Sequence, residues 1–165
     1  MSVGLVVVSH SAKIAEGVVE LAGQMPGDVR IQAAGGTDDG GIGTDPTLIA
    51  EAIAAADEGQ GVLVLVDLGS AVLSAQLAID ELVEEETRAR VRIAEAPVVE
   101  GAFFAAVQAS TGSSLEEVEQ AARGAATMIK VKPAAAGGPG EVAGGAAGAD
   151  GGPSPGGAPV DQAGR

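Results

Sequence analysis

One histidine stands alone in this chain of 165 residues, and its position suits chemistry. His10 lies between Ser9 and Ser11, where an apolar run ends and a helical pattern begins. When a carboxylate binds one imidazole nitrogen, the other nitrogen keeps a free lone pair and can act as a nucleophile. The chain has no cysteine, which excludes thiol nucleophiles, disulfides and zinc–thiolate sites. His10 is therefore the first candidate for a reactive group.

A second candidate group begins where another apolar run ends, at Asp67, and continues through Gly69 and Ser70. Asp67 can orient the imidazole of His10 and stabilise positive charge on it. The first turn of a helix presents unpaired N–H groups that attract a phosphoryl group, and glycine permits close backbone approach. Ser11, at the start of the helix after His10, is a further candidate to bind the phosphoryl group. Together these residues suit a histidine that is phosphorylated and then gives the phosphoryl group away.

Plainer interpretations remain open for the same residues. His10 can be an ordinary, partly exposed residue at the end of a strand. Asp67 can simply cap the following helix by accepting the N–H of Gly69 or Ser70, and Ser11 can cap the helix after His10.

The segment GGTDDGGIGT, residues 35–44, is a candidate loop at the same site. It lacks the Gly-Lys-Ser/Thr of a P-loop, the spacing of a dinucleotide fingerprint and the alternating oxygen ligands of an EF-hand. Two carboxylates would repel phosphate, so we expect Thr37 and Asp38 to shape the rim of the site. A plain flexible connection is the alternative.

Apolar runs alternate with helical patterns along the chain. The expected strands cover 3–8, 29–33, 61–67 and 90–94, and the expected helices cover 12–25, 46–57, 69–86, 98–110 and 115–128. In the first helix, Ile14, Val18, Leu21 and Met25 fall on one face, and Pro26 follows it. This order predicts an α/β fold: a small open, mostly parallel four-stranded sheet with helices on both faces.

Parallel strands place their carboxyl ends at one edge, where ligands of open α/β sheets bind. If the first and third strands are neighbours, His10 and Asp67 lie at the same rim.

Composition limits the partners of this chain. The formal net charge of −14 repels nucleic acid and anionic membranes, and Phe103 and Phe104 are the only aromatic residues. The apolar run at 3–8 is too short to span a bilayer and follows no basic segment, so we expect a cytoplasmic protein. No metal-ligand set is visible in the sequence.

The composition changes after Lys132. Residues 133–165 are dominated by Gly, Ala and Pro and have almost no large apolar side chain to bury, which predicts a disordered tail or linker. The expected folded domain covers residues 1–132.

Three motifs, VVVSHSAKIAEGV, GGTDDGGIGT and VLVLVDLGSAVLSAQLAIDEL, occur in the order and spacing of a known family. Residues 1–130 resemble the phosphotransferase subunit of bacterial phosphoenolpyruvate-dependent dihydroxyacetone kinase, which has the mannose-family IIA fold of the sugar phosphotransferase system. The resemblance implies that His10 is phosphorylated, that Asp67 orients it, and that Gly69 and Ser70 face the phosphate.

The resemblance also implies the partners. The family accepts its phosphoryl group from the phosphocarrier protein and passes it to ADP on the nucleotide-binding subunit of the kinase. We therefore expect no cofactor on this chain, with ADP, ATP and Mg on that partner subunit, and a homodimer formed through the sheet edge. The acidic surface suits a phosphocarrier with a basic face.

Two other functions stay open. A sugar-transporter IIA domain would pass its phosphoryl group to a IIB protein, and a regulatory or binding module would never be phosphorylated. Some relatives carry a phosphocarrier-like domain after the IIA domain, so the segment 133–165 is expected to be either the tail of a single-domain form or the remnant of a fusion.

Overall fold

The computed structural model describes residues 1–133 of the chain. The predicted disordered tail therefore lies outside the described residues, apart from Pro133. The strands are β1 (Gly4–Ser9), β2 (Ile31–Gly35), β3 (Val62–Val66) and β4 (Val91–Ile93). The helices are α1 (Ala12–Ala22), α2 (Pro46–Ala56), α3 (Gly69–Leu77), the π-helix η1 (Ala78–Leu82), α4 (Glu85–Arg88), α5 (Val98–Ser110), α6 (Leu115–Gly124) and the 3₁₀-helix η2 (Ala125–Thr127).

The four strands form one open sheet in the order β2-β1-β3-β4, and every pair is parallel. The predicted α/β class and the four-stranded parallel sheet are confirmed. β1 and β3 lie side by side, with Val8 opposite Val66, and Ser9 at the end of β1 pairs with Gly35 of β2. The carboxyl ends of β1, β2 and β3 consequently meet at one edge.

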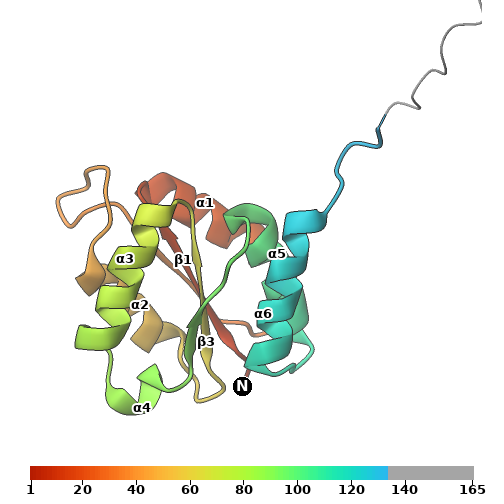
Figure 1. Ribbon diagram of the computed structural model, residues 1–165. Helices are drawn as coiled ribbons and strands as arrows, with labels where there is room; N and C mark the ends of the chain where they lie inside the picture. Colours follow the sequence, from red (N-terminus) through yellow and green to blue (C-terminus); the bar gives the residue numbers. More distant parts are fainter. Residues whose placement is uncertain (134–165) are drawn as a thin grey trace, which may run out of the picture. The chain divides into compact units, whose positions relative to one another are not determined.

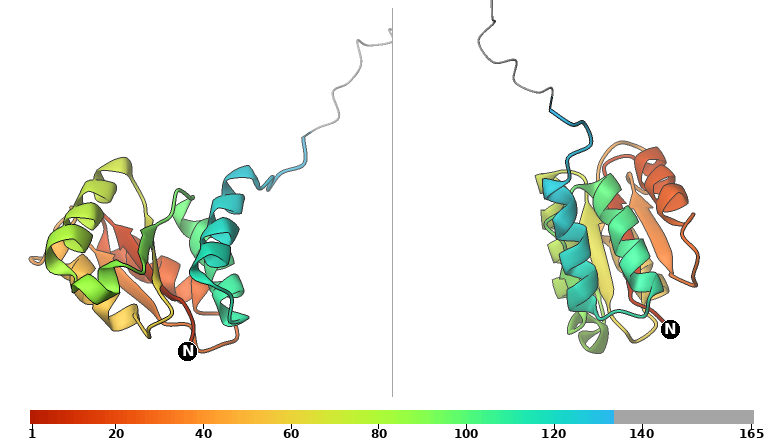
Figure 2. Two further views of the ribbon diagram at one scale, coloured as in Figure 1. Left: turned by 60° about the horizontal axis from the view of Figure 1, so that its bottom comes forward. Right: turned by 90° about the vertical axis from the view of Figure 1, so that its right-hand side faces the viewer.

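Helices cover both faces of the sheet (Figures 1 and 2). One core cluster lies between the sheet and α1, α5 and α6, and the other lies between the sheet and α2, α3 and η1. All six residues of β1 are buried, because this central strand is covered on both faces. The apolar sequence of β1 therefore reflects its place between two helical layers.

Helix α1 differs from the prediction in its length and in its buried face. It ends at Ala22, before Pro26, and its buried residues are Ala15, Val18 and Ala22. Ile14 and Leu21 are exposed, at 49% and 46%. The expected face is therefore only half right: Val18 is buried and Met25 packs against the core, whereas the alanines at 15 and 22 take the buried positions in place of Ile14 and Leu21.

The single helix predicted over 69–86 is divided into α3, η1 and α4. Val83 adopts an extended backbone after η1 and is buried in the second core cluster, so the chain turns there. The prediction failed because burying Val83 requires this break. The acidic residues of the segment are exposed as expected: Asp80, Glu81, Glu84, Glu85 and Glu86.

Other helix and strand boundaries differ from the predicted ones by a few residues. β2 begins and ends two residues later than predicted, and the last helix ends at Gly124, followed by η2. Contacts group Met1–Lys130 into one compact unit. None of the helices described in residues 1–133 is long and apolar enough to cross a membrane.

Candidate phosphoryl-transfer site

The candidate site lies at the edge where the central strands end. His10 follows β1 and Asp67 follows β3, so the pairing of these two strands places both residues at one edge. In Figure 1 the starts of α1 and α3 and the loop between β2 and α2 gather at this same end of the sheet. The structure thus brings together segments that are about sixty residues apart in the sequence.

The imidazole of His10 is bonded to the carboxylate of Asp67. Nδ1 of His10 lies 3.0 Å from Oδ1 of Asp67, and the backbone N–H of His10 donates to Oδ2 at 3.0 Å. An ionised carboxylate only accepts hydrogen bonds, so Nδ1 carries the hydrogen and the lone pair of the neutral ring stays on Nε2. The His10 and Asp67 side chains are 23% and 12% exposed, so the ring remains accessible to a partner.

Hydrogen bonds keep Asp67 ionised. Burial alone would raise the pKa of Asp67, but donors outweigh it and hold the pKa below the usual value. The donors are the backbone and ring of His10, the hydroxyl of Ser9 and the backbone N–H of Leu68. A carboxylate held in this way can stabilise a positive charge on the imidazole.

Ser70 occupies the other side of the ring. Its Oγ lies 2.8 Å from Nε2 of His10. Because Nε2 carries the lone pair in the tautomer set by Asp67, the Ser70 hydroxyl donates to it. Ser70 therefore touches the same nitrogen that a phosphoryl group would take.

Ser9 is a member of the site that the sequence left without a role. It is fully buried, donates to Oδ2 of Asp67 at 2.9 Å and accepts the N–H of Ser11 at 3.1 Å. The only available signal was a polar residue closing an otherwise apolar strand. Ser9 joins the carboxylate to the start of α1, which fixes both.

Ser11 is at the N-cap position of α1, but its side chain makes no capping hydrogen bond. The expected hydroxyl cap is therefore wrong. The backbone N–H of Ser11 itself donates to the hydroxyl of Ser9.

The start of α3 rules out the simple capping role for Asp67. The N-cap residue of α3 is Leu68, and Oδ1 of Asp67 accepts the N–H of Leu68 at 2.7 Å, not that of Gly69 or Ser70. A side chain at Gly69 would meet no atom within 4 Å. Gly69 precedes Ser70 in the first turn of α3, and the Ser70 hydroxyl contacts Nε2 of His10.

The loop of residues 36–45 is tied to the site through its backbone. The N–H of Gly36 donates to the carbonyl of Ser9, and the N–H of Gly43 donates to the carbonyl of His10, at 3.1 and 2.9 Å. Within the loop, the Thr37 hydroxyl donates to Asp39, and the N–H of Gly41 donates to both side chains. Thr37 and Asp39 thus order the loop, and the side chains of Asp38 and Asp39 are both exposed.

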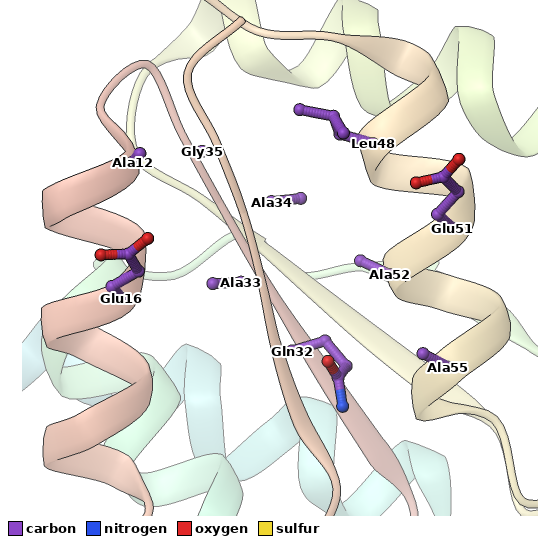
Figure 3. A pocket seen from close by; sticks show the side chains of 10 residues that line it. All are labelled: Ala12, Glu16, Gln32, Ala33, Ala34, Gly35, Leu48, Glu51, Ala52 and Ala55. Atoms are coloured by element: carbon purple, nitrogen blue, oxygen red, sulfur yellow. The ribbon is translucent and has the colours of Figure 1, made fainter. Parts of the chain in front are cut away.

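Residues 1–133 contain no group of three or more His, Cys, Asp or Glu side chains that could hold a metal ion. A groove of about 300 Å³ runs along β2 between α1 and α2 (Figure 3). Glu16 and Glu51 stand on its two sides, and Gln32 and alanines line it. His10 does not line this groove, so it is separate from the candidate site.

Comparison with known proteins gives consistent matches. A family model described as PTS system fructose IIA component (EIIA-man) matches residues 4–119. A phosphoryl donor subunit DhaM of PEP-dependent dihydroxyacetone kinase 2 from Listeria innocua is 44% identical over 119 residues, which are 72% of this chain and 94% of that protein. The DhaM subunit of Escherichia coli is 45% identical over 120 residues, 70% of this chain but only 25% of the longer relative.

A solved structure shares the fold. The crystal structure of EF1359, a protein of unknown function, is 40% identical in sequence, with a TM-score of 0.68 over 76% of this chain and 95% of that one. The chain therefore belongs to the mannose-type IIA family of the phosphotransferase system, in the branch of phosphoryl donor subunits of PEP-dependent dihydroxyacetone kinase.

Proposed function

We propose that this chain carries a phosphoryl group on Nε2 of His10, accepting it from the phosphocarrier protein and passing it to ADP on the nucleotide-binding subunit of dihydroxyacetone kinase. The observation that carries the proposal is the contact between Nδ1 of His10 and Oδ1 of Asp67, which leaves the Nε2 lone pair as the nucleophile. The relatives named as phosphoryl donor subunits support the same role.

The first transfer needs no external base. As Nε2 binds phosphorus, the bond between phosphorus and the donor atom breaks, and that atom keeps the electron pair. The hydrogen stays on Nδ1, so the phosphorylated ring carries a positive charge beside the carboxylate of Asp67. This charge pairing stabilises the phosphorylated form of the protein until the phosphoryl group is transferred.

The surroundings of Nε2 suit a phosphoryl group. The Ser70 hydroxyl can turn from Nε2 to a phosphoryl oxygen, and α3 starts beside it with the N–H groups of Gly69 and Ser70 in its first turn. N–H groups at a helix start and a hydroxyl donor are common anion ligands. Ser11 offers a further hydroxyl at the start of α1.

The second transfer reverses the bond change. The bond between phosphorus and Nε2 breaks as a terminal oxygen of ADP binds phosphorus, which yields ATP and returns the neutral ring. The nucleotide and Mg belong, in this proposal, to the partner subunit. Positioning and charge stabilisation supply most of the catalysis of phosphoryl transfer, so one oriented histidine suffices on this chain.

Labelled phosphoenolpyruvate tests the proposal. With the first enzyme of the phosphotransferase system and the phosphocarrier protein, label should appear on this chain as an acid-labile, base-stable adduct. His10→Gln should take none, and added kinase subunits with ADP should remove the label from the wild type. Label on the His10→Gln chain, or none on the wild type, would overturn the proposal.

A sugar-transporter role is the second candidate, because the matching family model is described by a sugar-transport component. In that case a IIB protein, and not ADP on a kinase subunit, would discharge the phosphorylated chain. Adding each acceptor separately to labelled protein distinguishes the two functions.

We also propose a homodimer through a sheet edge. The two outer strands, β2 and β4, each have an unpaired edge within the described sheet. Glu16 and Glu51 flank β2 (Figure 3). Two copies joined along β2 would bring these carboxylates near those of the second copy. Such a dimer should dissociate more readily at low salt, since screening reduces charge repulsion. Sedimentation at two ionic strengths measures this, and a monomer under all conditions would reject the dimer.

A further inference from the structure

A pair of hydroxyl groups joins the loop before α2 to the middle of α3. Oγ1 of Thr44 lies 2.6 Å from Oγ of Ser74, and both residues are half-buried. Among the hydrogen bonds of residues 1–133, this is the only one that connects the loop of residues 36–45 with α3. We call the bond between Thr44 and Ser74 the hydroxyl link.

Capping of the two helices does not account for the hydroxyl link. The start of α2 is capped by Asp45, whose carboxylate accepts the N–H of Thr47 at 2.8 Å, so it does not use the hydroxyl of Thr44. A serine inside a helix usually points to solvent or bonds a carbonyl one turn earlier. Ser74 instead bonds a residue thirty positions away in the chain, so the link connects two elements of the tertiary structure.

The two ends of the link lead to the backbone and to the ring of His10. On the loop side, Gly43 precedes Thr44, and the N–H of Gly43 donates to the carbonyl of His10 at 2.9 Å. On the helix side, Ser70 lies one turn before Ser74 on the same side of α3. Oγ of Ser70 is 2.8 Å from Nε2 of His10. The loop, the hydroxyl link and the first turn of α3 therefore form a closed path that starts and ends at the histidine.

The start of α3 is not fixed by a side-chain cap. Its N-cap residue, Leu68, makes no such hydrogen bond, and the next two residues, Gly69 and Ser70, are exposed. A bond one turn further along the helix, at Ser74, limits how far this start can move from the imidazole. Such control matters because a misplacement of about 1 Å can slow a transfer reaction strongly.

We propose that Thr44 and Ser74 are positioning residues for phosphoryl transfer: their link holds α3 at the distance at which the hydroxyl of Ser70 meets Nε2 of His10. The inference rests on the proposed function, because the positioned hydroxyl serves the nitrogen that is phosphorylated. When Nε2 binds phosphorus, the link keeps Ser70 and the first N–H groups of α3 within reach of the phosphoryl oxygens. Thr44 and Ser74 act through Ser70 and do not bond the imidazole themselves.

Removal of either hydroxyl tests the link. Thr44→Val replaces the hydroxyl by a methyl group, and Ser74→Ala removes the other partner. In each variant, phosphorylation of His10 at saturating phosphocarrier protein should slow about tenfold, while KM stays at the wild-type value. Thr44→Ser keeps the hydroxyl and should restore the wild-type rate. The matched control is Thr47→Val, at an exposed threonine in α2, which should also keep that rate.

The double variant Thr44→Val/Ser74→Ala separates one shared bond from two independent effects. If the two hydroxyls act through their link, the double variant should lose about tenfold in rate, as each single variant does. A loss of about a hundredfold, the product of two independent effects, would overturn the link.

The ¹⁵N NMR signal of Nε2 in the unphosphorylated protein is a readout that a purely structural role would not move. In Thr44→Val and Ser74→Ala, the signal should move toward its position in Ser70→Ala, which lacks the donor to Nε2. A signal at the wild-type position in both variants would overturn the proposal, and so would a displaced signal with a wild-type transfer rate.

The same measurements distinguish failure of the link from failure of the proposed function. Label transfer at the wild-type rate in Thr44→Val would reject the link and keep the function. Absence of label on the wild type would reject the function, whereas the Nε2 signal would still decide whether the link holds Ser70 at the ring.

Discussion

At the residue scale, the site depends on a buried serine that makes no contact with substrate. Ser9 holds Oδ2 of Asp67 and the N–H of Ser11, while Asp67 holds the ring of His10. The hydroxyl is therefore a positioning group, which acts through the carboxylate. Groups of this kind fix the tautomer and orientation of a reactive histidine.

Ser9→Ala should slow phosphorylation of His10 about tenfold and destabilise the fold by about 1–2 kcal/mol. The variant removes one donor from Asp67 and one acceptor from the start of α1. Transfer rates and urea denaturation measure the two effects, and ¹⁵N NMR of the imidazole should show a larger share of the other tautomer. If the tautomer ratio stayed at the wild-type value, the role of Ser9 would be structural only. The control is Ser2→Ala, which removes only a long hydrogen bond of 3.4 Å.

The lowered pKa of Asp67 predicts that the free energy of unfolding depends on pH. Its pKa is lower in the folded protein than in the unfolded chain, so its interactions stabilise the fold above the unfolded pKa of about 4. That contribution disappears as pH falls through the lower, folded pKa. The stability difference between wild type and Asp67→Asn should therefore shrink as the pH falls below about 4, as measured by urea denaturation. A difference that does not change on acidification would contradict this interpretation.

At the element scale, the start of α1 is pressed against the end of β2. A Cβ added to Gly35 would lie 2.6 Å from the carbonyl oxygen of Ser11 and 2.8 Å from Cα of Ala12. Backbone atoms cannot move aside cheaply, so glycine is required at this point. The close approach holds the segment that carries His10 against the sheet.

Gly35→Ala should therefore cost about 1–3 kcal/mol of stability and displace the start of α1. Gly69→Ala is the matched change at the start of α3, where an added Cβ meets nothing within 4 Å, and should alter stability by less than about 0.5 kcal/mol. If Gly69 lies against the phosphoryl group, its alanine variant should still be phosphorylated more slowly. Thermal denaturation and transfer rates measure both variants, and a wild-type rate for Gly69→Ala would exclude it from the phosphate site.

At the scale of the whole molecule, the two ends of the sheet have different tasks. His10 and Asp67 lie at the carboxyl ends of the strands, whereas Asp57 and Arg90 form an ion pair near the amino ends of β3 and β4, with Arg90 Nη2 2.7 Å from Asp57 Oδ2. Asp57 also accepts the Thr87 hydroxyl and the N–H of Gly59. Hydrogen bonds from Arg90 are the main cause of the lowered pKa of Asp57. This cluster ties the end of α2 to the entry of β4.

Asp57→Asn should lower stability by about 1–2 kcal/mol, because it removes a charge-assisted pair that is only partly shielded from solvent. The rate of His10 phosphorylation should stay at the wild-type value, since the change is at the opposite end of the sheet. Urea denaturation and label transfer on the same preparation test both statements. A large loss of transfer rate at a temperature where the variant is fully folded would show that the two ends are coupled.

Much of this architecture follows from local pattern. The apolar runs that end at Val8 and Val66 are buried strands, and the alternation of strands and helices predicted the parallel sheet that the structure has. His10, Asp67 and Ser70 could be proposed together because a parallel sheet brings the carboxyl ends of neighbouring strands to one edge. The local sequence pattern fails to predict the structure where packing between elements determines it. At Val83, burial of the side chain in the core accompanies a break in a helix that the sequence pattern would continue.

The sequence by itself determined the fold class, the lone histidine and the edge at which it stands, because strand periodicity and chain order are local properties. Only the tertiary structure decided which groups touch the imidazole. The hydroxyls of Ser9 and Ser70 reach Asp67 and His10 across some sixty residues of chain. Such contacts are set by strand register and by the distance between packed backbones, which no short segment encodes.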